Sequence, residues 1–414
     1  MILYAAVRAT AAHCPECRKD LKALGEVIRI RAREGGLRPR VHQAAQFGLL
    51  DLSAALPFDR RRARRALDKL AALPRDKRLD RIDRARTAFR DPALVEAAIE
   101  RSNAALGSSV DVAFHWLEVA QALYGRLNAR PFPVSLLAAL SLRLMARRAN
   151  VFRVAEEYPA AESLWKRIRA DCRLERVWDP TALAELASLE SSLLLNLRRP
   201  GGAENRLSLA YDLYWLAGWS EGMITVSIKM GNVAFYSGKL LEAQEKASQA
   251  LDLIGGEQNR QWLLASHSLA LYSCSLGDYS EARRTLREIE PYYASLGTPS
   301  LEVAYEWLAA RIAAGHGERE TAQQGFTAAR TTYLESGLAY GAALVTLDLA
   351  ELHLTQGHLP AVQALAQETL TVFERQNVPS EAARAISLLS QAATAQRLTA
   401  ALLARLRRGL GGQG

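Results

Sequence analysis

Small and apolar residues recur along this chain in two series that keep one long period. The first series advances by 42, 40, 39, 40 and 40 residues and consists of Ala149, Ser191, Gly231, Ala270, Ala310 and Ala350. The second advances by the same intervals and consists of Ala161, Ala203, Ala243, Ala282, Ala322 and Val362. Apolar residues spaced by three and four lie on one stripe of a helix, and small side chains there let a neighbouring helix approach closely. The pattern predicts six repeats of a helix pair.

The repeats are clearest in two consecutive copies, at residues 230–250 and 269–289. Each copy has a small residue on one helix, a turn with Gly238 or Gly277, and a stripe of small and apolar residues on the next helix. This arrangement resembles the tetratricopeptide repeat, a helix hairpin that stacks into a solenoid. The resemblance implies an all-α fold, a right-handed α-solenoid of tetratricopeptide-like helix hairpins. Longer helices and turns account for a period about six residues above the usual ~34.

Turn signals and changes in composition divide the chain, with the clearest break at residues 128–133, where two prolines flank Phe132. The expected segments are a degenerate zinc-finger-like N-terminal segment at 1–37, a basic helical region at 38–91, a degenerate helical hairpin at 92–130, six tetratricopeptide-like repeats at 131–379 and C-terminal capping helices at 380–410.

Composition supports the helical interpretation and indicates the cellular compartment. The 414 residues are 49% hydrophobic and 23% charged, which describes an ordinary soluble chain, and no convincing alternating strand occurs. No apolar run approaches the roughly 18 residues that span a bilayer, and the N-terminus lacks the leading basic segment of a signal peptide. Four cysteines in this length do not make a disulfide framework. A cytoplasmic protein without membrane contact is therefore expected.

The formal net charge of +9 is concentrated near the N-terminus. Residues 59–90 hold thirteen Arg or Lys against five Asp, an excess of eight. Two short helices with an arginine face suit contact with nucleic-acid phosphates or an acidic partner. The alternative is a solvated face, because interleaved aspartates such as Asp68 and Asp80 make i,i+4-type pairs and no aromatic platform accompanies the charge.

The first 35 residues contain the motif His13-Cys14-Pro15-Glu16-Cys17, followed by an amphipathic run. Two thiolates separated by two residues are able to hold one tetrahedral Zn²⁺, so Cys14 and Cys17 are candidate metal ligands. The motif resembles the zinc-containing anti-sigma domain of bacteria, although Thr10 stands where that pattern has His. The alternative is two free thiols at a helix start. Zinc at this motif is the one cofactor that the sequence suggests.

The resemblance to tetratricopeptide repeats places a ligand groove on the concave face, which the first helix of each pair forms. Stepping by three and four along that helix, on the stripe next to the small residue, selects the groove side chains, and the predicted set is Asn150, Arg153, Asn232, Phe235, His267, Trp307, Arg311 and Glu351. In peptide-clamping members an Asn directly after the small residue holds an extended ligand, which the resemblance implies for Asn150 and Asn232. The alternative is polar residues on a wet surface. His267 alone is better explained as a packed or solvated residue than as a ligand or base.

The sequence contains no phosphate loop, no His-Glu-x-x-His pair and no serine elbow, so we expect no enzyme. The predicted function is a non-catalytic scaffold or regulator, of bacterial type, that binds a protein or peptide in the groove. The alternative is a transcription-linked regulator with an anti-sigma-like or nucleic-acid-contacting basic N-terminal module.

Overall fold

The computed structural model describes residues 60–85, 88–127, 132, 134–175, 180–375 and 385–396. All regular structure in these ranges is helical, which confirms the predicted all-α class of tetratricopeptide-like hairpins. The motif at Cys14 and Cys17 and most of the expected C-terminal cap lie outside the described residues. No helix in the described part has the length and apolar character needed to cross a membrane.

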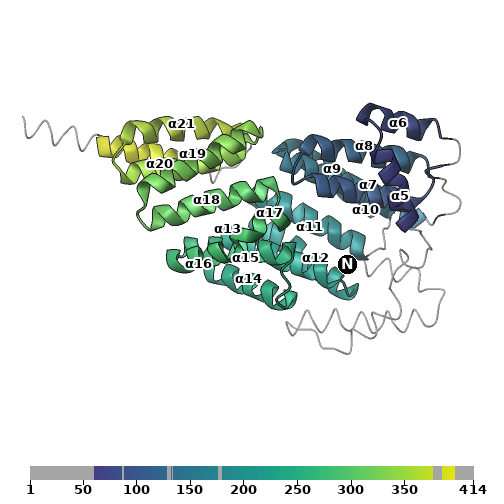
Figure 1. The fold of residues 1–414 in the computed structure, drawn as a ribbon, viewed down its shortest axis with the longest axis horizontal. Helices are drawn as coiled ribbons and strands as arrows, with labels where there is room; N and C mark the ends of the chain where they lie inside the picture. The colour runs from purple at the N-terminus through teal and green to yellow at the C-terminus, as the bar shows by residue number, and fades with distance from the viewer. Residues whose placement is uncertain are drawn as a thin grey trace, which may run out of the picture. The chain divides into compact units, whose positions relative to one another are not determined.

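Consecutive helices pair as hairpins, and the two helices of a hairpin lie side by side (Figure 1). Two short helices come first, α5 (Arg60–Ala71) and α6 (Arg75–Asp83). The hairpins that follow are α7 (Pro92–Ala105) with α8 (Val110–Gly125), α9 (Val134–Val154) with α10 (Tyr158–Glu175), α11 (Pro180–Asn196) with α12 (Pro200–Leu216), α13 (Ser220–Tyr236) with α14 (Leu240–Ile254), α15 (Arg260–Ser275) with α16 (Tyr279–Ile289), α18 (Pro299–Gly315) with α19 (Arg319–Glu335), and α20 (Ala339–Thr355) with α21 (Leu359–Arg375). A 3-10 turn, η1 (Glu290–Tyr292), and the single-turn α17 (Tyr293–Leu296) extend the fifth of these hairpins. Helix α13 meets α14 through Ala234, which is buried with Ala243 and Ala247.

The chain forms two compact units, unit 1 at Met1–Val233 and unit 2 at Ala234–Gly414. Unit 1 has buried apolar clusters centred on α7 with α8 and on α11 with α12. Unit 2 has its own clusters, around α15, α16 and α18 and around α18, α19 and α20. Each unit therefore has its own packed interior.

The small residues of both periodic series are buried, as close helix packing requires. Within each hairpin they stand on the two facing helices, for example Ala270 on α15 and Ala282 on α16, both fully buried. The least regular pair, Ser191 and Ala203, is buried in the same way. At the close approach of α18 and α19, a Cβ built on Gly325 comes within 2.8 Å of the Ala310 Cβ.

A residue with positive φ ends the first helix of each of the six hairpins from α9 onward. These residues are Glu156, Arg198, Gly238, Gly277, Gly317 and Gly357, and they keep the period of the two buried series. Glycine is favoured at such a position because it has no Cβ to clash with the backbone. The first two repeats use a charged residue there, so their turns adopt a conformation that an L side chain disfavours.

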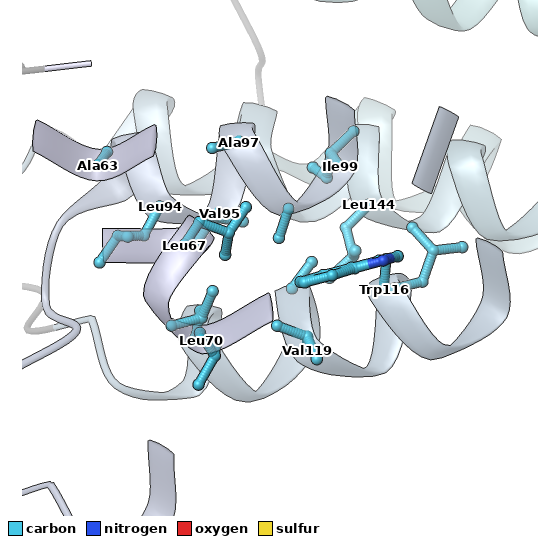
Figure 2. Close-up of a cluster of buried hydrophobic side chains, with 14 of the residues drawn as sticks. Ala63, Leu67, Leu70, Leu94, Val95, Ala97, Ile99, Trp116, Val119 and Leu144 are labelled. Atoms are coloured by element: carbon cyan, nitrogen blue, oxygen red, sulfur yellow. The ribbon is translucent and has the colours of Figure 1, made fainter. Parts of the chain in front are cut away.

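The basic region packs onto the first hairpin through an apolar stripe on α5. Ala63, Leu67 and Leu70 are buried against α7 and α8 beside Trp116 (Figure 2). Arginines of α5 and α6 pair with acidic residues of the hairpin, namely Arg60 and Arg64 of α5 with Glu96 and Glu100, and Arg75 of α6 with Asp111.

The two aspartates singled out in the sequence behave differently. Asp80 accepts from Arg84 four residues later at 3.4 Å, as an i,i+4 pair does. Asp68 instead pairs with Arg101 of α7, because α5 lies against that helix. The predicted intrahelical pair is thus correct for Asp80 and wrong for Asp68.

Candidate functional site

In unit 1 the first helices of successive hairpins bring polar side chains together in one row. Glu185 of α11 is buried, and Arg143 and Arg147 of α9 donate to its two oxygens at 2.8 and 2.6 Å. Burial alone would raise the pKa of this carboxyl, but the two arginines outweigh that effect and lower the pKa to about 2. Glu185 is therefore ionised, and this part of the row is neutralised internally.

The row continues onto α7 through the same arginines. Arg147 Nη1 donates to Asn103 Oδ1 at 2.6 Å, and Arg143 lies 3.6 Å from a carboxylate oxygen of Glu96. Both arginines are therefore held from two sides, which fixes their orientation on the first-helix face.

Arg153, one of the predicted groove residues, has two amide side chains as its hydrogen-bond partners in the described part of the chain. Its Nε donates to Asn150 Oδ1 at 2.9 Å, and its Nη1 donates to Asn196 Oδ1 at 3.2 Å. Asn196 is oriented in turn by a hydrogen bond from its Nδ2 to the Tyr158 hydroxyl at 3.2 Å. The structure thus brings Asn150 and Arg153 together, with Asn150 buried and Arg153 half-buried.

Lys229 of α13 is a second half-buried cation in the row. Its Nζ donates to the backbone oxygen of Ser188 at 2.8 Å and to the Ser188 hydroxyl at 2.9 Å. Burial, with smaller contributions from Arg153 and Arg147, lowers the pKa of Lys229 to about 7. Within the described residues, neither Arg153 nor Lys229 has a carboxylate at ion-pair distance.

Two further predicted groove residues lie on α13, on either side of the sequence boundary between the units, and they pack in different ways. Asn232 is half-buried on α13, three residues after Lys229. The Phe235 ring stacks on that of Tyr272 with centroids 5.3 Å apart, beside the buried Ala234, Ala243 and Ala247. Phe235 is therefore largely a packing residue.

In unit 2, His267 of α15 is packed rather than free. Its Nδ1 lies 2.7 Å from the Tyr293 hydroxyl, and burial lowers its pKa to about 4. The imidazole is accordingly neutral near pH 7. This hydrogen bond between the imidazole and the tyrosine hydroxyl joins α15 to α17.

Trp307 and Arg311 of α18 meet a residue that the sequence analysis did not select, Asp348 of α20. The Trp307 indole donates to Asp348 Oδ2 at 2.7 Å, and Arg311 Nε lies 3.7 Å from the same oxygen. Arg311 also reaches Ser275 of α15 at 3.4 Å. Trp307 is half-buried against the cluster of α18, α19 and α20, whereas Glu351 is exposed.

Residues outside the predicted set carry many of these polar contacts, among them Arg143, Arg147, Glu185 and Lys229 in the row of unit 1 and, separately, Asp348 in unit 2. The sequence holds a signal for three of them, because Arg147, Lys229 and Asp348 all stand two positions before a small residue of the first series.

The described residues contain no group of three or more His, Cys, Asp or Glu side chains able to hold a metal ion. The candidate ligands Cys14 and Cys17 fall outside those residues. Cys274 is buried as a free thiol, and burial raises its pKa.

No family model matches the chain, and no curated protein matches it. Among solved structures, the chain is similar to a Rap protein complexed with competence and sporulation factor, at 13% identity over 72% of this chain and 98% of that one, with a TM-score of 0.47. It is similar to the Rap conjugation gene regulator of the plasmid pLS20 in complex with the Phr* peptide, at 12% identity over 75% and 97%, with a TM-score of 0.47. It is also similar to aspartyl phosphate phosphatase F from Bacillus subtilis, at 11% identity over 81% and 90%, with a TM-score of 0.45.

Proposed function

We propose that the first-helix face of unit 1 binds an acidic group of a protein or peptide ligand without catalysing a reaction. The observation that carries this proposal is the pair Arg153 and Lys229, two half-buried cations whose described partners are neutral amides, a hydroxyl and a carbonyl.

A half-buried cation without a counter-ion is costly, because desolvation is not repaid by an opposite charge. Each of these cations also has donors to spare. Lys229 uses two of its three N–H groups and Arg153 uses two of its five, counting the bonds within the described residues. A carboxylate of the ligand would neutralise the pair and accept charge-assisted hydrogen bonds, which are among the stronger ones in proteins.

The surroundings of the two cations suit an extended ligand. The row runs along α7, α9, α11 and α13, so a ligand that follows it crosses several first helices in turn. Asn232 occupies in its repeat the slot that Asn150 occupies two repeats earlier. The resemblance to tetratricopeptide repeats implies that amides in this slot contact the ligand backbone, which we extend here to Asn232.

A catalytic alternative rests on Ser188 and Lys229, whose Oγ and Nζ atoms are 2.9 Å apart. That distance and a lysine pKa of about 7 fit a nucleophile with its general base. However, Ser188 is buried in the middle of α11, where helix hydrogen bonds occupy the neighbouring backbone amides that an oxyanion hole needs. We therefore assign binding to this pair.

The test is a selection of peptides from a random library on the full chain, followed by affinity measurements on the peptides recovered. We expect acidic peptides, and we expect Arg153→Met and Lys229→Met each to weaken their binding by about tenfold or more, since a charged pair contributes about 1.5–3 kcal/mol. Arg148→Met is the matched control, because Arg148 is on α9 but exposed. Recovery of neutral or basic peptides, or equal binding by all three variants, would refute the proposal.

A further inference from the structure

The turns inside the hairpins share one backbone geometry that brings two side chains together. In the six hairpins from α9 onward, the amide of the residue that follows the positive-φ residue donates to a carbonyl five residues earlier. This bond joins Asp278 to Ser273, Glu318 to Ala313, and His358 to His353, at 3.0, 2.9 and 3.0 Å. The side chains at the two ends of this bond are thereby adjacent, although they are five residues apart.

In the turn between α20 and α21 both of these side chains are imidazoles. The Nδ1 atoms of His353 and His358 lie 3.4 Å apart, while the ring centroids are 5.6 Å apart, so the two nitrogens face each other. His353 is half-buried at the end of α20 and His358 is exposed.

We propose that His353 and His358 bind one divalent transition-metal ion, with Zn²⁺ the best match to their geometry. Zinc–imidazole bonds of about 2.0–2.1 Å at tetrahedral angles place the two nitrogens about 3.3–3.4 Å apart. The observed separation agrees with that value. Imidazole ligands favour ions such as Zn²⁺, Cu²⁺ and Ni²⁺ over Mg²⁺ or Ca²⁺, which prefer oxygen.

An unsatisfied polar atom in the same turn supports this site. The Oε1 of Gln356 is buried and has no hydrogen-bond partner within the described residues. The Gln356 side chain lies near His353. A buried acceptor without a partner is unfavourable, and a metal-bound water donating to Oε1 would give it one.

The experiment is a calorimetric titration of the full chain with ZnCl₂, in a Cys14→Ser/Cys17→Ser background that removes the sequence-predicted thiol ligands. We expect about one equivalent of Zn²⁺ per chain and little response to MgCl₂. His353→Gln and His358→Gln should each weaken binding by about tenfold or more, because loss of even an outer-shell partner costs about 10–100-fold. His316→Gln is the matched control, since His316 lies in the preceding repeat's turn with a tyrosine rather than a second imidazole beside it.

A second measurement needs no histidine variant. Co²⁺ bound at a tetrahedral site gives visible absorption bands, which should appear on the thiol-free chain and decline below about pH 6 as protons compete for the imidazoles. Zinc affinity unchanged by both His→Gln substitutions, or no zinc binding and no cobalt bands at neutral pH, would overturn the proposal. The site lies in unit 2, so these results are independent of peptide binding in unit 1.

Discussion

Lys229 is half-buried, so folding removes part of the water around its ammonium group. Its pKa is about 7 in the folded state, against about 10.4 for an exposed lysine. Between these values the unfolded chain holds more protons than the folded chain, so stability rises with pH across the window. At pH 7 and below the penalty of the buried charge remains. A residue with a purely structural role gains nothing from this loss of stability, whereas a residue that binds an acidic ligand needs the charge that causes it.

The first prediction follows from that difference. Lys229→Met should raise the stability of the ligand-free protein at pH 7 by on the order of 1–3 kcal/mol, as replacement of buried charges by apolar side chains often does. It should also flatten the rise in stability between about pH 7 and 10. Thermal melts of variant and wild type at several pH values measure both effects. A variant that is less stable than wild type at pH 7 would show that Lys229 is structural.

At the scale of the element, the periodic series predicted the packing stripe correctly, because a small side chain has to stand wherever two helix backbones come close. Ala270 and Ala282 are examples, and both are fully buried. It is harder to predict which side of each first helix carries the polar side chains of the proposed binding face. At 3.6 residues per turn, a side chain three positions before the small residue lies only about 60° from it, and one two positions before lies about 160° away.

In several repeats, neighbouring helices bury the side chain that stands three positions before the small residue. Ile228 and Leu347, three positions before their small residues, are buried. Lys229 and Asp348, one position later, carry the polar contacts of the first-helix face. Trp307 shares the nearer direction, which explains why it packs against its own unit and bonds to Asp348. Its pairing could not be predicted, since the two residues are 41 apart and meet only once the hairpins stack.

The second prediction concerns the turns. Gly277 has φ of +85°, and a Cβ added there meets no atom within 4 Å, so only the backbone conformation opposes a side chain. Gly277→Ala should therefore destabilise the protein by about 1–2 kcal/mol. Gly201→Ala is the matched control, because Gly201 is helical, also has open space and lacks a positive φ. Chemical denaturation compares the two, and equal stability of both variants would contradict the turn geometry.

At the scale of the whole molecule, the helices within each unit contact helices close to them in the chain, and each unit has its own buried clusters. In a repeat protein the stability is approximately a sum of local terms, because each repeat packs only on the next. Charge is also balanced locally, since arginines of α5 and α6 are paired with carboxylates of α7 and α8. A substitution that destabilises one hairpin should consequently increase local unfolding only in that hairpin and in those packed against it.

Ala282→Leu tests this locality, and with it the register of the repeats. Ala282 is fully buried where α16 meets α15, so an added side chain should overpack the interface and cost about 1–3 kcal/mol. Hydrogen exchange measured by mass spectrometry should accelerate in α14, α15, α16 and α18, and remain unchanged in α7 to α10 of unit 1. Ser280→Leu, on the exposed side of the same helix, should change stability by less than about 0.5 kcal/mol. Exchange that accelerates equally in both units would mean that they unfold as one cooperative body, and unchanged exchange everywhere would refute the close approach of α15 and α16.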